Sequence, residues 1–154
     1  MSTNRYEYQP KKVIVCGHSK IGHSQDAHEY DSILEARMAV LLIQNKIRFT
    51  PHVKFLGLVD KEGKEFTYTV DFLFERPQKF GLMCQWAMAI EVKGVLSYND
   101  IRRCDALAYW KNVPVYIATP AYIELWEKEG LMKPMRVAKI QLPQRQKEET
   151  DNVV

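Results

Sequence analysis

Residues 65–93 read EFTYTVDFLFERPQKFGLMCQWAMAIEVK and contain two alternating apolar runs, each of which carries an acidic residue. In residues 65–75, apolar and polar side chains alternate as they do in a half-buried β-strand, and the regular alternation ends at Asp71. Residues 86–93 form the second run. Its last three residues are Glu91, Val92 and Lys93. The pattern predicts neighbouring strands that bring two carboxylates and a lysine to one patch of a sheet.

These two carboxylates favour a divalent metal site. Two carboxylates side by side repel each other unless a cation lies between them. Mg²⁺ and Mn²⁺ prefer hard oxygen ligands, and a nearby lysine can neutralise charge developing on a phosphate or orient a water molecule. Asp71, Glu91 and Lys93 are therefore the central candidate site residues, and they favour a metal-dependent nuclease.

Length and composition are those of one soluble domain. The chain has 154 residues, 46% of them hydrophobic and 27% charged, which is enough for a full hydrophobic core. Three scattered cysteines do not make a disulfide framework and favour a reducing compartment. The net charge of +3 permits nucleic-acid binding without demonstrating it.

No feature of the sequence predicts membrane insertion or export. Residues 1–12 are polar and lack an apolar signal core, and no apolar run approaches the roughly 20 residues that span a bilayer. We therefore expect a cytoplasmic protein that does not enter a membrane.

The remaining periodicity predicts an α/β fold with a mixed β-sheet flanked by helices. The expected domain limits are an N-terminal arm and loop over 1–30, a single domain over 31–142 and a polar tail over 143–154. Residues 16–30 are expected to be loop. The expected helices are 32–46, about 99–110 and 119–130, and the expected strands are 48–59, 65–75, 86–93, 115–118 and 136–142.

Glu35 is a further site candidate because of its place on the first predicted helix. Ser32 and Glu35 form a capping-box pattern, and Ile33, Ala36 and Val40 begin an apolar stripe. Glu35 lies outside that stripe, above small and apolar residues that form a second buried side. Its carboxylate can therefore point inward, or it can do no more than close the capping box.

Three motifs in this order resemble those of the PD-(D/E)XK nuclease superfamily. They are the helix start Ser32-x-Leu34-Glu35, the strand TYTVDF at 67–72 and the strand end EVKG at 91–94. The resemblance covers about residues 30–118 and is closest to phage junction-resolving endonucleases, with similarity also to transposon endonucleases. The proline that gives the motif its name is replaced by Val70, a mild departure, because that residue only shapes the strand before Asp71.

The resemblance implies a restriction-endonuclease-like fold and a metal-dependent DNA endonuclease. In such a site Asp71, Glu91 and the backbone carbonyl of Val92 would hold Mg²⁺ or Mn²⁺. Lys93 would position or deprotonate the attacking water, and Glu35 would complete the site directly or through metal-bound water. Selectivity for branched DNA such as four-way junctions is one option. The alternatives are a DNA-cutting subunit of a mobile element or restriction system, and a non-catalytic nucleic-acid-binding module, which the clustered acids disfavour because they repel phosphate.

Arg102 and Arg103 are the candidate DNA-binding residues. They are expected in the first turn of a helix, where positive charge opposes the helix dipole, and this small cost suggests phosphate binding. The alternative is an ion pair between Arg102 and Asp105, three residues apart.

Four aromatic residues are expected in the core: Tyr109, Trp110, Tyr116 and Trp126.

Two further features lead to weaker expectations. Zinc ligands are offered by Cys16, His18, His23 and His28. Their spacing matches no standard zinc motif, so a polar loop is preferred.

A four-way junction has two-fold symmetry, which favours a symmetric homodimer. The apolar segments Val13–Val15 and 137–142 could add strands across the two-fold axis, or could cover the edges of the protein's own sheet.

Overall fold

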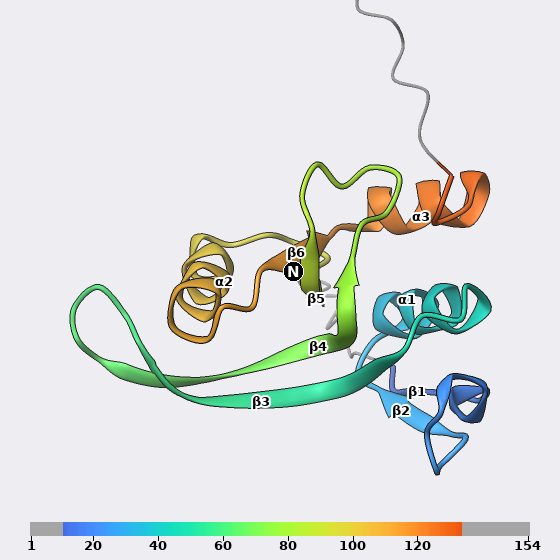
Figure 1. The fold of residues 1–154 in the computed structure, drawn as a ribbon, viewed down its shortest axis with the longest axis horizontal. Coiled ribbons are helices and arrows are strands. Elements are labelled where there is room, and N and C mark those ends of the chain that lie inside the picture. Colours follow the sequence, from blue (N-terminus) through green and yellow to red (C-terminus); the bar gives the residue numbers. More distant parts are fainter. Residues whose placement is uncertain (1–10, 134–154) are drawn as a thin grey trace, which may run out of the picture.

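The computed structural model describes residues 11–133, and it confirms a mixed α/β fold (Figure 1). The strands are β1 (Val13–Val15), β2 (His28–Tyr30), β3 (Phe49–Val59), β4 (Glu65–Gln78), β5 (Ala87–Val92) and β6 (Val115–Ala118). The helices are the short 3₁₀ helix η1 (His18–Ile21), α1 (Ile33–Gln44), α2 (Tyr98–Lys111) and α3 (Pro120–Glu129). The predicted strand at 136–142 lies outside the described residues.

The main sheet has the strand order β3-β4-β5-β6. The first three strands are antiparallel neighbours, and β6 runs parallel to β5 after the crossover through α2. Phe72 of β4 is paired with Ile90 of β5. Asp71 and Glu91 are the adjacent residues on the two strands, so this register brings the two acids together, as the sequence predicted.

Helices cover both faces of the main sheet. On one face lie α1 and α3 (Figure 1), and the larger hydrophobic cluster includes Phe72, Ile90 and Trp126. On the other face, α2 contributes Cys104 and Leu107 to a second cluster. Because apolar groups on both faces of β4 and β5 are removed from water, the central strands are held rigidly, and so is the position of their polar residues.

Helix α1 begins where the sequence predicted, because the Ser32 hydroxyl accepts a hydrogen bond from the Glu35 backbone N–H at 3.1 Å. Its buried side agrees with the predicted stripe only in part. Ala36 is buried as predicted, and Met38 and Ala39 are fully buried, whereas Ile33 is 49% and Val40 is 39% exposed.

Several boundaries differ from the prediction by one to three residues. Strand β4 continues to Gln78, beyond its predicted end at residue 75, because Gln78 still pairs with Ala87 of β5. Helix α2 begins at Tyr98 with Ser97 as its N-cap, two or three residues before the predicted cap at Asn99 or Asp100, because Ser97 and Asp100 form a capping box. The predicted start of α3 at Thr119-Pro120 and its end at Gly130 are confirmed.

The segment 16–30 was predicted as loop, but it contains η1 and β2. Strand β2 pairs with β1 in a separate two-stranded sheet, and Tyr30 is fully buried in the larger cluster. Val13–Val15 therefore pairs within its own chain, but in a separate small sheet and not at an edge of the main sheet, which was the arrangement considered for it. In the part of the chain that the structure describes, no helix has the length and apolar character needed to cross a bilayer.

Candidate metal centre

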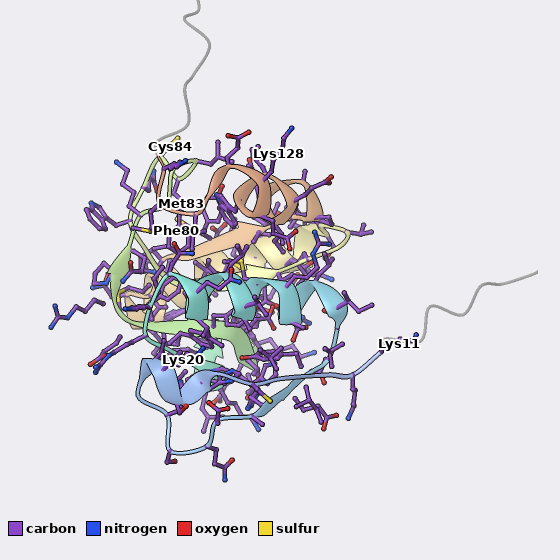
Figure 2. The ribbon with its side chains drawn as sticks, turned by 90° about the vertical axis from the view of Figure 1, so that its right-hand side faces the viewer. Lys11, Lys20, Phe80, Met83, Cys84 and Lys128 are labelled. Atoms are coloured by element: carbon purple, nitrogen blue, oxygen red, sulfur yellow. The ribbon has the colours of Figure 1, made fainter. Side chains whose placement is uncertain are left out.

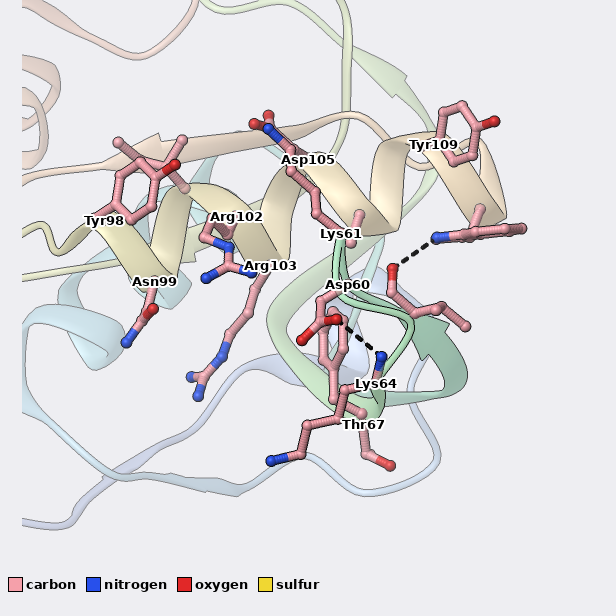
Figure 3. A pocket seen from close by; sticks show the side chains of 15 residues that line it. Asp60, Lys61, Lys64, Thr67, Tyr98, Asn99, Arg102, Arg103, Asp105 and Tyr109 are labelled. Carbon is pink, nitrogen blue, oxygen red and sulfur yellow. Dashed lines mark hydrogen bonds between the residues drawn. The ribbon is translucent and has the colours of Figure 1, made fainter.

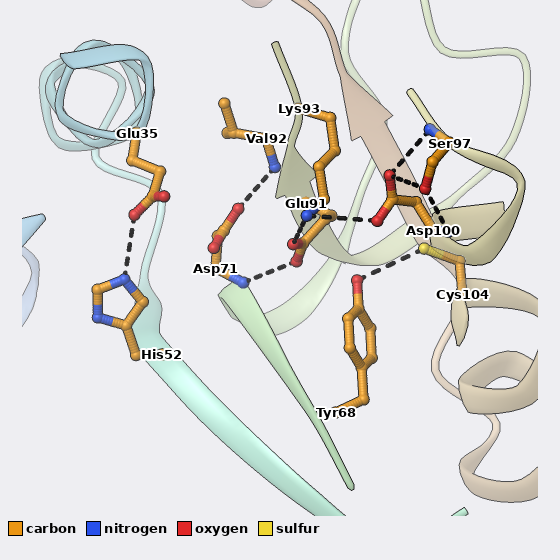
Figure 4. A network of polar contacts seen from close by, with 10 residues as sticks. All are labelled: Glu35, His52, Tyr68, Asp71, Glu91, Val92, Lys93, Ser97, Asp100 and Cys104. Atoms are coloured by element: carbon orange, nitrogen blue, oxygen red, sulfur yellow. Dashed lines mark hydrogen bonds and ion pairs between the residues drawn. The ribbon is translucent and has the colours of Figure 1, made fainter. Parts of the chain in front are cut away.

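Asp71 and Glu91 lie side by side on β4 and β5 and are almost completely removed from solvent. Asp71 is 9% exposed and Glu91 is 4% exposed. The Asp71 backbone N–H donates to Glu91 Oε2 at 3.2 Å, and the Val92 backbone N–H donates to Asp71 Oδ2 at 2.7 Å (Figure 4). These reciprocal bonds fix both carboxylates and leave Asp71 Oδ1 and Glu91 Oε1 outside the backbone bonds between the strands.

The two buried acids resist ionisation in the protein alone. Burial, together with the negative charges of Glu91 and Glu35, raises the pKa of Asp71 to about 8. Burial also raises the pKa of Glu91, although Lys93 and the Tyr68 hydroxyl favour its charged form. Removing a carboxylate from water penalises the charged state, and a second carboxylate adds repulsion. A cation between the two acids would offset both costs.

Lys93 supplies one positive charge at the end of β5. Its Nζ lies 3.5 Å from Glu91 Oε1 and 3.4 Å from Asp100 Oδ1. Burial lowers the pKa of Lys93, but the charges of Glu91 and Asp100 outweigh burial, and the pKa lies above its ordinary value. Lys93 is therefore held in its charged form, as a hydrogen-bond donor rather than a proton acceptor.

Asp100 belongs to this network, although the sequence indicated only a helix cap. Its Oδ2 accepts hydrogen bonds from the Ser97 backbone N–H at 2.9 Å and from the Ser97 hydroxyl at 2.8 Å. The other oxygen faces Lys93. Burial raises the pKa of Asp100, but the bonds from Ser97 and the charge of Lys93 outweigh it and keep the pKa below its usual range. The capping pattern Ser97-x-x-Asp100 was the available signal, and the contact with Lys93 depends on the crossover of the chain.

Glu35 points inward from α1, but its direct partner is a residue that the sequence did not single out. His52 Nε2 donates to Glu35 Oε2 at 3.2 Å, and His28 Nε2 lies 3.1 Å from His52 Nδ1. The Glu35 carboxylate therefore does not close the capping box back to Ser32. Figure 4 shows the carboxylates of Glu35 and Asp71 turned toward each other from opposite sides.

The carboxylate and imidazole groups suit a divalent ion at two adjoining positions. Asp71 and Glu91 offer hard carboxylate oxygens of the kind that Mg²⁺ and Mn²⁺ prefer. Next to them, Asp31, Glu35 and His52 have ligand atoms that all lie within 4.8 Å of one another, the one such group of three among residues 11–133. Glu35 lies between the two places. The backbone carbonyl of Val92, predicted as a ligand, follows directly after Glu91 at the end of β5.

Arg102 and Arg103 do not lie in the first turn of α2, because the helix begins at Tyr98. The argument from an unfavourable helix dipole therefore does not apply to them. Neither arginine forms an ion pair within the described part of the chain, so the alternative pairing of Arg102 with Asp105 is also wrong. Arg102 instead lies over the Tyr98 ring, 5.9 Å from its centroid.

The residues considered for zinc do not bring their ligand atoms together within residues 11–133, and two of the histidines bond to other groups. His18 Nδ1 donates to the Asp26 carbonyl at 3.0 Å, and the Tyr30 hydroxyl donates to His18 Nε2 at 2.6 Å. His23 Nε2 bonds to the Phe49 carbonyl. Cys16 is exposed. These contacts fasten the segment 16–30 to the core and explain its histidines without zinc.

The aromatic residues divide between core and surface. Trp126 is buried and Tyr116 packs against the core, as predicted. Tyr109 is 80% and Trp110 is 51% exposed, so the expectation that they belong to the core is wrong.

Comparisons with family models, with curated proteins and with solved structures found no match to this chain.

Proposed function

We propose that this protein is a metal-dependent DNA endonuclease that hydrolyses phosphodiester bonds with Mg²⁺ or Mn²⁺. The observation that carries the proposal is the buried pair of Asp71 and Glu91 with Lys93 at 3.5 Å from Glu91. Two ionised acids buried on a rigid sheet reduce stability unless a cation lies between them. Their retention inside a folded domain therefore favours a metal-binding role.

Each side chain has a separate task in this proposal. Asp71 and Glu91 would hold the ion, and the hydrogen bonds from the backbone of the opposite strand fix their orientation. A divalent ion in such a site would make a nucleophile available near neutral pH and stabilise the added negative charge on the phosphate. Lys93 is held positively charged, so its role is to orient the attacking water or stabilise the charged phosphate oxygens rather than to remove a proton.

Glu35 contributes through the second group of ligands. His52 fixes its carboxylate, and Asp31 has a ligand atom within 4.8 Å of those of Glu35 and His52. Glu35 would therefore help to hold an ion, directly or through a water molecule. This would give helix α1 a direct role in the site.

The test is a cleavage assay on a four-way junction, a linear duplex and a single strand, each with Mg²⁺, Mn²⁺ or a chelator. We expect cleavage that requires the metal and falls at least about a hundredfold in Asp71→Asn and Glu91→Gln. Glu129→Gln, an exposed acid on α3, is the matched control and should retain full activity. Circular dichroism of each variant confirms folding.

The substrate panel separates the candidate functions. Faster cleavage of the junction than of the duplex supports selectivity for branched DNA, whereas equal cleavage supports a cutting subunit of a mobile element or restriction system. Metal-independent DNA binding without cleavage would contradict the enzyme and leave a non-catalytic binding module. Wild-type cleavage rates in purified Asp71→Asn would show that the site is wrongly assigned.

A further inference from the structure

A groove lies between α2 and the turn that joins β3 to β4. It has a volume of about 750 Å³, which is within the range of ligand clefts (Figure 3). The hairpin forms one wall through residues 59–67, and one side of α2 forms the other. The Trp110 indole N–H donates to the Val59 carbonyl at 2.9 Å and so ties the two walls together at one end.

The groove carries an excess of positive charge. Four cationic side chains line it: Lys61, Lys64, Arg102 and Arg103. None of the four forms an ion pair within residues 11–133. Two acids also line the groove. Of these, Asp60 is engaged in the turn, where it accepts hydrogen bonds from the Glu62 and Lys64 backbone N–H groups, both at 2.9 Å. Free cations in a concave site attract an anionic ligand.

Exposed aromatic rings alternate with these charges. Tyr98 is 70% exposed, Tyr109 is 80% exposed and Trp110 is 51% exposed. One face of α2 carries four of the lining residues, because they are three or four positions apart: Tyr98, Arg102, Asp105 and Tyr109. Burying these rings in the core would have been favourable, so their exposure beside cations requires an explanation. Aromatic rings interleaved with cations are the usual surface for unpaired bases and their phosphates.

The groove also leads toward the metal centre. Tyr98 lies two residues before Asp100, and Asp100 contacts Lys93. The 14 residues of α2 extend for about 21 Å, long enough to contact several nucleotides of a single strand. A strand lying along α2 would therefore end near Lys93.

We propose that this groove binds a single-stranded segment of DNA, with its phosphates on the four cations and its bases on Tyr98, Tyr109 and Trp110. The inference rests on the proposed nuclease function and extends it, because it assigns the single-stranded part of the substrate to a defined surface. An unpaired flap or the open centre of a branched molecule would supply such a segment.

The test measures binding in a chelator, where cleavage does not interfere. A fluorescent oligothymidylate and a duplex of equal length are titrated with protein at several salt concentrations. We expect Lys61→Gln/Lys64→Gln to weaken binding of the single strand about tenfold at low salt and to reduce the salt slope by about 1.4, as expected for two lost phosphate contacts. Tyr98→Ala/Tyr109→Ala should also weaken it about tenfold, through lost stacking.

Lys20→Gln/Lys128→Gln is the matched control, since both lysines are exposed and lie on other elements (Figure 2). It should bind as the wild type does. Unchanged binding in both groove variants would overturn the proposal, as would tighter binding of the duplex with no effect of the tyrosine substitutions. Binding without metal-dependent cleavage would refute the nuclease but not the groove. Cleavage with no effect of the groove variants would refute the groove alone.

Discussion

Replacing Asp71 by asparagine removes one of two buried ionisable groups and keeps the shape of the side chain. The asparagine carbonyl can still accept the hydrogen bond from the Val92 backbone N–H. The substitution therefore isolates the electrostatic cost of the metal-free site from any loss of packing.

The pKa of Asp71 gives the sign and the size of the effect. Its folded-state pKa is raised from 3.8 to about 8, so its contribution to stability is fully present below the unfolded-state value and is lost as the pH rises through about 8. One pKa unit corresponds to about 1.4 kcal/mol, and the free energy of unfolding therefore falls by roughly 5 kcal/mol at most between about pH 4 and pH 9. Asparagine stays neutral and avoids this loss.

Urea unfolding across this pH range in a chelator measures the difference. We expect Asp71→Asn and the wild type to be equally stable near pH 4, and the variant to be more stable by a few kcal/mol near pH 9. Saturating Mg²⁺ should recover about 3 kcal/mol in the wild type at the higher pH, if present at a hundred times its dissociation constant, and much less in the variant. Asp105→Asn, an exposed acid on α2, serves as the control. Parallel stability curves for Asp71→Asn and the wild type would refute both the raised pKa and the metal-binding role.

Three further predictions concern the site, the core and the assembly. Lys93→Gln should lower the single-turnover cleavage rate at least about tenfold while leaving DNA affinity in chelator within about twofold, and an unchanged rate would exclude Lys93 from the chemistry. Phe72→Ala should reduce the free energy of unfolding by about 3–5 kcal/mol in urea titrations, because Phe72 is fully buried against Tyr30 and Phe49, and a loss below about 1 kcal/mol would contradict that packing. Sedimentation equilibrium at micromolar concentration should show a homodimer, and a single active species near the 18.0 kDa chain mass would rule it out.

The sequence predicted the elements whose local signals and tertiary contacts agree. The cap at Ser32, the alternation of 65–75 and the Thr119-Pro120 helix start each have one strong local explanation, and the structure contains all three. The proximity of Asp71 and Glu91 was predicted from the two alternating strands together with the order of the nuclease-like motifs. A strand that alternates buried and exposed residues has its register constrained by its buried face, and neighbouring strands must then match.

The sequence could not predict contacts between distant segments. His52 has a positive φ of 52° and faces a helix that precedes it by several residues, and no local pattern announces its bond to Glu35. The strand His28–Tyr30 has three residues, too few for a periodicity, and it is held by its pairing with β1 and by the burial of Tyr30. Tyr109 and Trp110 were assigned to the core from their chemistry, although the nearby hairpin leaves that side of α2 open as a groove.

The double role of Asp100 makes the placement of Lys93 depend on local unfolding. One oxygen of this carboxylate caps α2 and the other holds the lysine, so any opening of the first helical turn releases both at once. Helix ends open more often than the whole protein unfolds. The amide hydrogen-exchange rates of the first turn of α2 therefore report how often Lys93 loses one of its two acidic partners. A DNA strand lying against Tyr98 would slow that exchange and, through Asp100, keep the lysine in position for longer.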